Sequence, residues 1–308
     1  MKRVLPIAAI PHELWHNSML LMPSVLTNAY KSELDSRGLL AKAKAGTKKK
    51  EIHGGGSDDE TLEHFAFRFA VSAGRVEFVA LAPDEKLAEV SDAFMSTFSE
   101  GHVALLDIPC GTGSCLAAVL STLFSLREAG VIPTQPLTIS VMAGDCSPKA
   151  LEVYRSTISR LLPLLESQAI SAQLRLQDWD ATLGKDTARL LDSWFDMTAG
   201  AEEHVVCISN FNGALIGAGI LDQFTPCLNQ ILSRLYDKKS TLLWVEPETK
   251  SAKTKLFPKI AEYLQKFIPW FASSAGVTVP MAASYQTKNP LNEFEHPSSV
   301  QVQKFNRN

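Results

Sequence analysis

The feature that most constrains the fold is a regular alternation of short apolar runs and helical patterns, beginning near residue 101. The runs are rich in aliphatic and β-branched residues, as in 103–106 and 138–143, and most of them are followed by an acidic residue. Each run precedes a segment with apolar residues at helical spacing, such as 114–128. Because this unit occurs five times, the sequence predicts a parallel sheet with right-handed crossovers.

The predicted strands of these units are 103–106, 138–143, 172–176, 204–209 and 241–245. Two further runs, 277–285 and 299–305, follow the last predicted helix and have the composition of strands. We expect them to form a closing antiparallel pair. The expected fold class is therefore α/β, with a seven-stranded, mostly parallel sheet.

The first hundred residues lack this alternation. We predict that residues 1–100 form a mainly helical N-terminal extension, or lid, ahead of a domain of residues 101–308. Helical patterns cover 13–30, 61–71 and 84–98, whereas 75–81 has the composition of a strand.

A segment of biased composition lies within the extension. Residues 37–50 include six basic side chains and no acidic one, and three glycines and three acidic residues follow. Such a composition buries too little apolar surface to order itself, so we predict a mobile basic loop over 37–60. Its lysines are candidates for contact with RNA, through Lys42, Lys44, Lys48, Lys49 and Lys50.

The overall composition indicates an ordinary globular protein. Of its 308 residues, 45% are hydrophobic and 20% charged, and the net charge of −3 gives nucleic acid no general attraction. The five cysteines include no pair separated by two residues, so we expect reduced thiols and no metal site. No apolar run is long enough for a membrane span, and prolines interrupt the apolar stretch 4–10. We therefore expect a cytoplasmic protein without membrane contact.

A glycine pair lies where the first predicted strand turns into the first helix. Gly111 and Gly113 leave room for a ligand to approach the backbone, and the helix that follows offers unpaired N–H groups. A dinucleotide fingerprint needs a third glycine at the position of Leu116, and no lysine of a Walker loop follows. The residues alone therefore favour a ligand site of another class.

The stretch from Asp107 to Gly113 resembles the first motif of class I S-adenosylmethionine-dependent methyltransferases, Asp-x-x-Cys-Gly-Thr-Gly. Residues 144–151 look like the second motif of that family, and 177–179 like the third. All three motifs fall at predicted strand ends, where ligands bind to open parallel sheets. The resemblance covers about residues 100–250 and implies a Rossmann-like fold.

The resemblance also implies roles for individual residues. The methionine part of S-adenosylmethionine would lie against Asp107, Cys110, Gly111 and Gly113. In the same way, Asp145 would bind the ribose, and Asp178 and Trp179 the adenine.

The fourth motif of the family would correspond to residues 208–213, which lack the Asn-Pro-Pro-Tyr pattern of enzymes that methylate exocyclic amino groups. We expect Asn210 to border the cofactor and Phe211 and Asn212 to border the methyl acceptor. The expected activity is methyl transfer to oxygen or nitrogen of a small molecule or a protein. An RNA methyltransferase and a non-catalytic binding protein with this fold stay open as alternatives.

The methyl group of a sulfonium needs little chemical help, because the enzyme mainly aligns acceptor, methyl and sulfur. A base is useful for some acceptors, and His16 and Glu246 are candidates for it. His12, Trp15 and Tyr30 form an unusual polar and aromatic set in the extension, which we interpret as part of the acceptor site.

Overall fold

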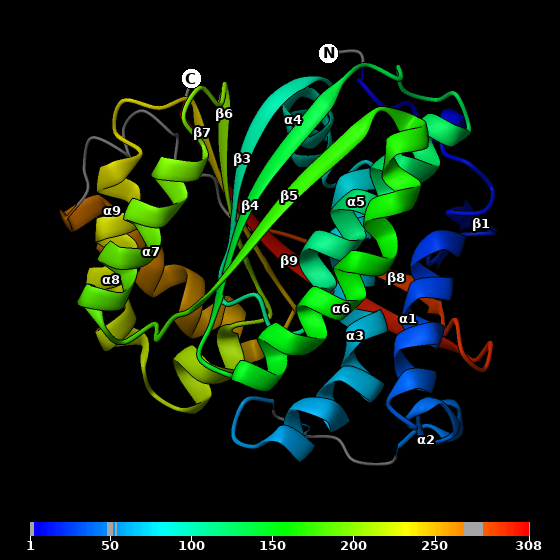
Figure 1. The fold of residues 1–308 in the computed structure, drawn as a ribbon, viewed down its shortest axis with the longest axis horizontal. Coiled ribbons are helices and arrows are strands. Elements are labelled where there is room, and N and C mark those ends of the chain that lie inside the picture. The colour runs from blue at the N-terminus through cyan, green and yellow to red at the C-terminus, as the bar shows by residue number, and fades with distance from the viewer. Residues whose placement is uncertain (1–2, 48–51, 53, 268–279, 308) are drawn as a thin grey trace.

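The computed structural model describes residues 3–47, 52, 54–267 and 280–307 (Figure 1). Nine strands in these residues form one sheet, in the order β1-β2-β8-β9-β7-β6-β3-β4-β5. The strands are β1 (Trp15–His16), β2 (Met19–Leu21), β3 (Gly101–Asp107), β4 (Leu137–Asp145), β5 (Ile170–Asp178), β6 (Glu203–Ser209), β7 (Ser240–Glu246), β8 (Met281–Lys288) and β9 (Glu295–Arg307).

The seven strands predicted from the sequence are all present, as β3 to β9. Strands β3 to β7 pair in parallel with one another, and β9 pairs antiparallel with both β7 and β8. The predicted α/β class and the closing antiparallel pair are therefore confirmed. The chain progresses from β3 toward β5 in one direction and from β6 toward β7 in the other, so strand order reverses between β3 and β6.

Helices cover both faces of the sheet (Figure 1). One face carries α1 (Ser24–Ser36), α3 (Asp58–Leu81), α5 (Ser114–Glu128) and α6 (Pro148–Leu165), and the other carries α7 (Gly184–Met197), α8 (Leu221–Arg234) and α9 (Phe257–Phe267). The shorter elements are α2 (Leu40–Ala45), α4 (Ala88–Thr97), and the single turns Ile7–Ala9, Glu166–Gln168, Gly213–Gly217 and Ala252–Leu256. None of the helices in the described part of the chain could cross a membrane.

Alternation along the central strand divides the core into two clusters. Val103 and Leu105 of β3 point into the cluster that contains α5, whereas Ala104 and Leu106 point into the one that contains α7 and α8. A strand buried on both faces needs apolar residues at every position, which explains its unbroken apolar run.

Three predictions for the extension are wrong. The sheet has nine strands instead of seven, because β1 and β2 form a short hairpin that adds β2 in parallel to β8. A helix over 13–30 is also wrong, since α1 begins only after Pro23.

The segment 75–81, predicted as a strand, continues α3 instead. Val76, Phe78, Val79 and Ala80 are all buried, so this part of the helix is apolar on almost every side and shows no helical period. The segment predicted as a mobile loop contains α2, and its Lys48, Lys49 and Lys50 lie outside the described residues.

A buried carboxylate joins the extension to the sheet domain. Glu33 of α1 accepts hydrogen bonds from Arg37 Nε at 2.7 Å, from Arg160 Nε of α6 at 2.8 Å and from Ser156 Oγ of α6 at 2.7 Å. Burial alone would raise the pKa of Glu33, but hydrogen bonds from Ser156, Arg160 and Arg37 outweigh it and lower the pKa below its ordinary value. Glu33 therefore fixes α1 against α6 in its ionised form.

We expect Glu33→Gln to lower the free energy of unfolding by about 2 kcal/mol at pH 7, because it removes the buried negative charge that accepts hydrogen bonds from Arg37 and Arg160. The folded-state pKa is lowered, so this stabilisation exists above the unfolded pKa and is lost as the pH falls through the folded value. The free energies of unfolding of the two proteins, measured with urea, should therefore converge as the pH falls from the unfolded pKa of about 4.3 through the lower folded value.

The matched control is Glu152→Gln, which removes an exposed carboxylate that also binds Arg37, at 2.9 Å. An exposed pair contributes about 1 kcal/mol at most, so this variant should unfold almost as the parent does. Equal losses for both variants would contradict the role given to Glu33.

Candidate functional site

The loop after β3 lies at the point where strand order reverses, which is where open α/β sheets bind ligands. Gly111 and Gly113 both adopt positive φ values, of 51° and 91°, and α5 begins at the next residue. A Cβ atom at Gly113 would lie 3.0 Å from the Tyr154 ring, so this position has both a conformational and a steric need for glycine. The turn brings backbone N–H groups to the carboxyl edge of the sheet.

Asp145, at the end of β4, closes this loop. Its Oδ2 accepts a hydrogen bond from Gly111 N, and its Oδ1 accepts one from Ser147 N, both at 2.9 Å. Burial raises the pKa of Asp145 despite these bonds. Each carboxylate oxygen has a second lone pair, so Asp145 can still accept bonds from two ligand hydroxyls.

Asp178 lies directly beside Asp145, because the two residues are partners in the parallel pairing of β4 and β5. Asp178 is exposed, whereas Asp145 is buried. The structure thus brings together the two acids that the motifs assign to the ribose and the adenine.

Asp107, at the end of β3, is a buried acid with unused hydrogen-bonding capacity. Its Oδ2 accepts a bond from Tyr154 Oη at 3.1 Å, and its Oδ1 has no partner among the described residues. Burial raises the pKa of Asp107 to about 8, and the nearby Asp145 adds to the shift. An amino group placed at the glycine turn would supply the missing partner for Oδ1 and favour the ionised acid.

Trp179 and Cys110 are less available than the resemblance implies. The Trp179 side chain is 1% exposed, its Nε1 donates to Thr187 Oγ1 at 3.0 Å, and its ring packs edge-on against Phe224. Stacking on adenine would require this ring to be uncovered, so Trp179 acts as a core residue in this structure. Cys110 is also buried, beside the glycine turn.

The loop after β6 is held by Glu246 at the end of β7. Glu246 Oε1 accepts bonds from Phe211 N at 2.8 Å, Asn212 N at 3.1 Å and Trp244 Nε1 at 2.9 Å. Burial raises the pKa of Glu246 to about 7. Because Oε1 accepts three bonds, Glu246 acts here as an anchor for the loop. Its buried Oε2 has no partner among the described residues, and its candidacy as a base stays a prediction.

The three residues of this loop face different surroundings. Asn210 has a positive φ of 55°, and its Oδ1 accepts a bond from Arg75 Nη1 of α3 at 2.7 Å. Phe211 is buried among aromatic rings, and Asn212 Nδ2 donates to Ser251 Oγ at 2.8 Å. Sequence reasoning missed Arg75, since nothing in the local pattern shows that α3 crosses the end of β6.

His12 and His16 of the extension lie far from this loop. His16 is in β1, at the edge of the sheet, and five strand spacings of about 4.8 Å separate β1 from β6, or ~24 Å. Its Nδ1 lies 3.0 Å from Nδ1 of His12, and both side chains are exposed. The position of His16 does not support it as the base beside this loop, so its role stays a prediction, and His12 lies at the same remote edge.

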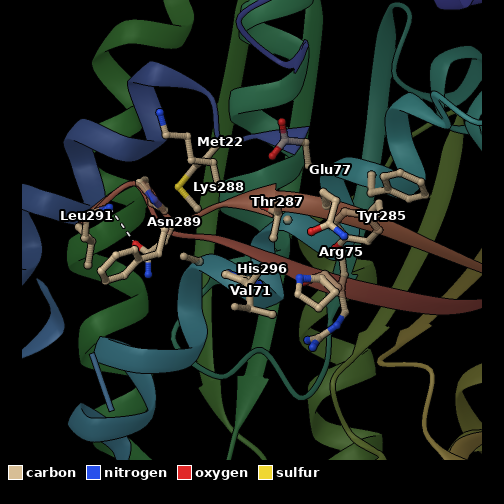
Figure 2. A pocket seen from close by; sticks show the side chains of 18 of the residues that line it. Met22, Val71, Arg75, Glu77, Tyr285, Thr287, Lys288, Asn289, Leu291 and His296 are labelled. Carbon is tan, nitrogen blue, oxygen red and sulfur yellow. Dashed lines mark hydrogen bonds between the residues drawn. The ribbon is translucent and has the colours of Figure 1, made fainter. Parts of the chain in front are cut away.

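Trp15 and Tyr30 both line a cavity of about 1120 Å³ between the extension and strands β8 and β9 (Figure 2). Tyr30 is a core residue in part, since its hydroxyl donates to Ala66 O at 2.8 Å and its ring stacks on Phe69. Arg75 borders the same cavity, so the cavity and the loop after β6 meet at this side chain.

The described residues show no arrangement that supports the predicted RNA contact or a metal site. Lys42 lies 3.5 Å from Glu63 and over the Phe67 ring, and Lys44 is exposed on α2. Within the described ranges, no three side chains of His, Cys, Asp or Glu are placed to hold a metal ion.

Comparison with known proteins gives matches among solved structures only. No family model and no curated protein matches the sequence. The rRNA methyltransferase AviRa from Streptomyces viridochromogenes is 12% identical over 69% of this chain and 82% of its own, with a TM-score of 0.32. Loganic acid methyltransferase with SAH is 11% identical over 71% of this chain and 68% of its own, with a TM-score of 0.34.

A structure described for the conversion of a disulfide bond into a thioacetal group during echinomycin biosynthesis is 13% identical over 70% of this chain and 81% of its own, with a TM-score of 0.33. Two of these three structures are named as methyltransferases. The strand order itself defines the Rossmann-like α/β fold of this chain.

The anchoring role of Glu246 predicts different outcomes for two substitutions. Glu246→Leu leaves three buried N–H groups without an acceptor and should lower the free energy of unfolding by about 3 kcal/mol. Glu246→Gln keeps an acceptor oxygen and should lose much less.

The pH dependence gives a second check on the same residue. The folded pKa is raised to about 7, so the stabilisation from the bound proton is complete below the unfolded pKa and is lost as the pH rises through 7. Glu246→Gln lacks this loss. Its free energy of unfolding, measured with urea, should therefore rise relative to that of the parent protein between pH 5 and pH 8. A Leu variant as stable as the parent would refute the anchor.

Proposed function

We propose that this chain is an S-adenosylmethionine-dependent methyltransferase. The observation that carries the proposal is the placement of Asp145 and Asp178 side by side, beyond a glycine turn that Asp145 itself closes. Two adjacent acids at a glycine turn suit a ligand with ribose hydroxyls and an adenine amino group. The reversal of strand order at this point supports the same location.

The residues at the glycine turn fit the rest of the cofactor. Asp107 Oδ1, which has no partner in the described part of the chain, would accept a hydrogen bond from the methionine amino group. Gly111, where an added Cβ would meet no other atom within 4 Å, would let the methionine chain approach the backbone, and Gly113 would leave room for the Tyr154 ring. When bound, S-adenosylmethionine supplies an activated methyl group, so alignment of the acceptor is the main task left to the protein.

The acceptor in this proposal carries oxygen or nitrogen and is a small molecule or a protein group. The loop 210–212, anchored by Glu246 and joined to α3 through Arg75 and Asn210, would form the border between cofactor and acceptor. Residues at this border would exclude water and orient the acceptor toward the methyl group.

The proposal predicts that S-adenosylmethionine and S-adenosylhomocysteine raise the melting temperature of the protein, whereas NAD does not. A ligand at a hundred times its Kd stabilises the native state by about 2.7 kcal/mol. Asp178→Ala should abolish the shift, because this acid would bind the adenine. Asp178 is exposed, so its removal disturbs little else in the structure. Asp145 is a poorer target, since its loss would also open the loop.

Asp196→Ala, an exposed acid on α7 outside the site, is the matched control and should keep the full shift. Transfer of labelled methyl groups to a pool of candidate acceptors then separates an enzyme from a binding protein. The proposal fails if neither adenosyl compound changes the melting temperature at millimolar concentration, or if NAD acts equally well.

A further inference from the structure

The large cavity has walls from four parts of the molecule (Figure 2). One face of α3 supplies residues at helical spacing, including Phe67, Ala70, Gly74 and Phe78, and the opposite wall is the β8–β9 hairpin from Ser284 to Ser299. Met22 and Trp15 lie at one side, and residues of α1 and α2 complete the enclosure. The volume of about 1120 Å³ is at the upper limit of small-molecule sites.

Glu77, in this wall, is a buried acid for which the fold provides no hydrogen-bond partner among the described residues. Its side chain is 0% exposed, and neither carboxylate oxygen has a hydrogen-bond partner among the described residues. Burial raises the pKa of Glu77 well above its ordinary value. A buried acid without partners destabilises a protein, so such a group in the wall of a cavity indicates a function in binding.

The ionisable side chains that line the same cavity are Tyr30, Arg68, Arg75, Glu77, Asp84, Tyr285, Lys288 and His296. Arg75 already donates to Asn210 Oδ1 and, at 3.3 Å, to Ser299 O. Lys288 Nζ lies 3.3 Å from Glu293, and Asp84 lies 3.7 Å from Lys86 Nζ. Glu77 therefore differs from these three in having no counter-charge or donor of its own.

Glu77 and Arg75 mark two separate ends of the cavity. The two residues are two positions apart on a helix, so their side chains leave the axis about 200° apart. Figure 2 shows the Glu77 carboxylate and the Arg75 guanidinium pointing in opposite directions. Arg75 points to the loop after β6, so Glu77 lies at the end away from the cofactor residues.

We propose that the cavity is the acceptor site and that Glu77 binds an amino group of a small-molecule acceptor. This inference rests on the proposed methyltransferase function. The amine supplies the hydrogen-bond donors and the positive charge that Glu77 lacks, and Phe67, Phe78 and Trp15 contact the apolar body of the ligand. The group to be methylated is then at the other end, beside Arg75 and Asn210.

Binding of an amine has a proton balance that can be measured. Burial raises the pKa of Glu77 and so favours its protonated form in the free protein, whereas the amine is an ammonium ion at pH 7. Formation of the ammonium–carboxylate pair releases one proton to the buffer. Other ligands, such as a carboxylate bound to the arginines, would not release this proton.

The test uses phenethylamine and 3-phenylpropionate as probes, which share an aromatic body and differ in charge. Isothermal titration of the full chain in two buffers of different ionisation enthalpy reports the Kd and the protons exchanged. We expect phenethylamine to bind with release of one proton, and 3-phenylpropionate to bind at least tenfold more weakly.

Glu77→Gln has the same shape and should weaken phenethylamine at least tenfold and abolish the proton release. Asp59→Asn, an exposed position on the same helix, should leave both unchanged. The inference is overturned if the two probes bind equally, if 3-phenylpropionate binds better, or if proton release is absent from the parent protein.

The melting-temperature shift with S-adenosylmethionine separates this inference from the proposed function. Glu77→Gln should retain that shift in full, because Glu77 lies away from the cofactor residues. Amine binding without any S-adenosylmethionine shift would refute the methyltransferase and leave an amine-binding cavity. An S-adenosylmethionine shift without amine binding would refute only the role of Glu77.

Discussion

The bond from Gly111 N to the Asp145 carboxylate is the interaction on which the site depends. It joins the loop after β3 to the end of β4 across the parallel pair, at 2.9 Å and largely out of water. Without it, the glycine turn would have no fixed distance from the acids at the ends of β4 and β5, and α5 would begin without a defined approach to the sheet. A charge-assisted bond in a buried position gives this geometry more rigidity than the flexible glycines could provide alone.

A second buried acid performs the same task on the other side of the reversal point. Glu246 gathers three N–H groups at one oxygen and so fixes the loop after β6, as Asp145 fixes the loop after β3. Both acids follow strands of the sheet, and burial raises the pKa of each. The carboxyl edge thus obtains its order from side chains at strand ends, whereas the apolar strands supply the framework that places them.

Most of the sheet could be predicted from the sequence because its signals are local. Strands β3, β4, β6 and β7 contain apolar runs, and β5 alternates apolar and polar residues. Ser147 and Pro148 indicate the start of α6 by capping chemistry, with Ala150 N donating to Ser147 Oγ at 3.2 Å. The predictions for the extension were poorer because tertiary contacts determine its secondary structure. The hairpin at 15–21 exists only against β8, and the second half of α3 is buried on so many sides that its composition resembles a strand. Arg75 and Glu77 belong to that half, so the cavity they line could not be foreseen.

Arg75 connects these two parts of the molecule. It belongs to the extension, yet its guanidinium binds Asn210 of the loop that Glu246 anchors and the Ser299 carbonyl of β9. A ligand in the cavity that displaced or tightened these bonds would act directly on the loop beside the glycine turn. An acceptor held at Glu77 and a cofactor held at Asp145 and Asp178 would therefore influence each other through a single side chain, which is a simple physical basis for binding one in the presence of the other. The extension is thus placed to link the recognition of an acceptor to the site at the carboxyl edge of the sheet.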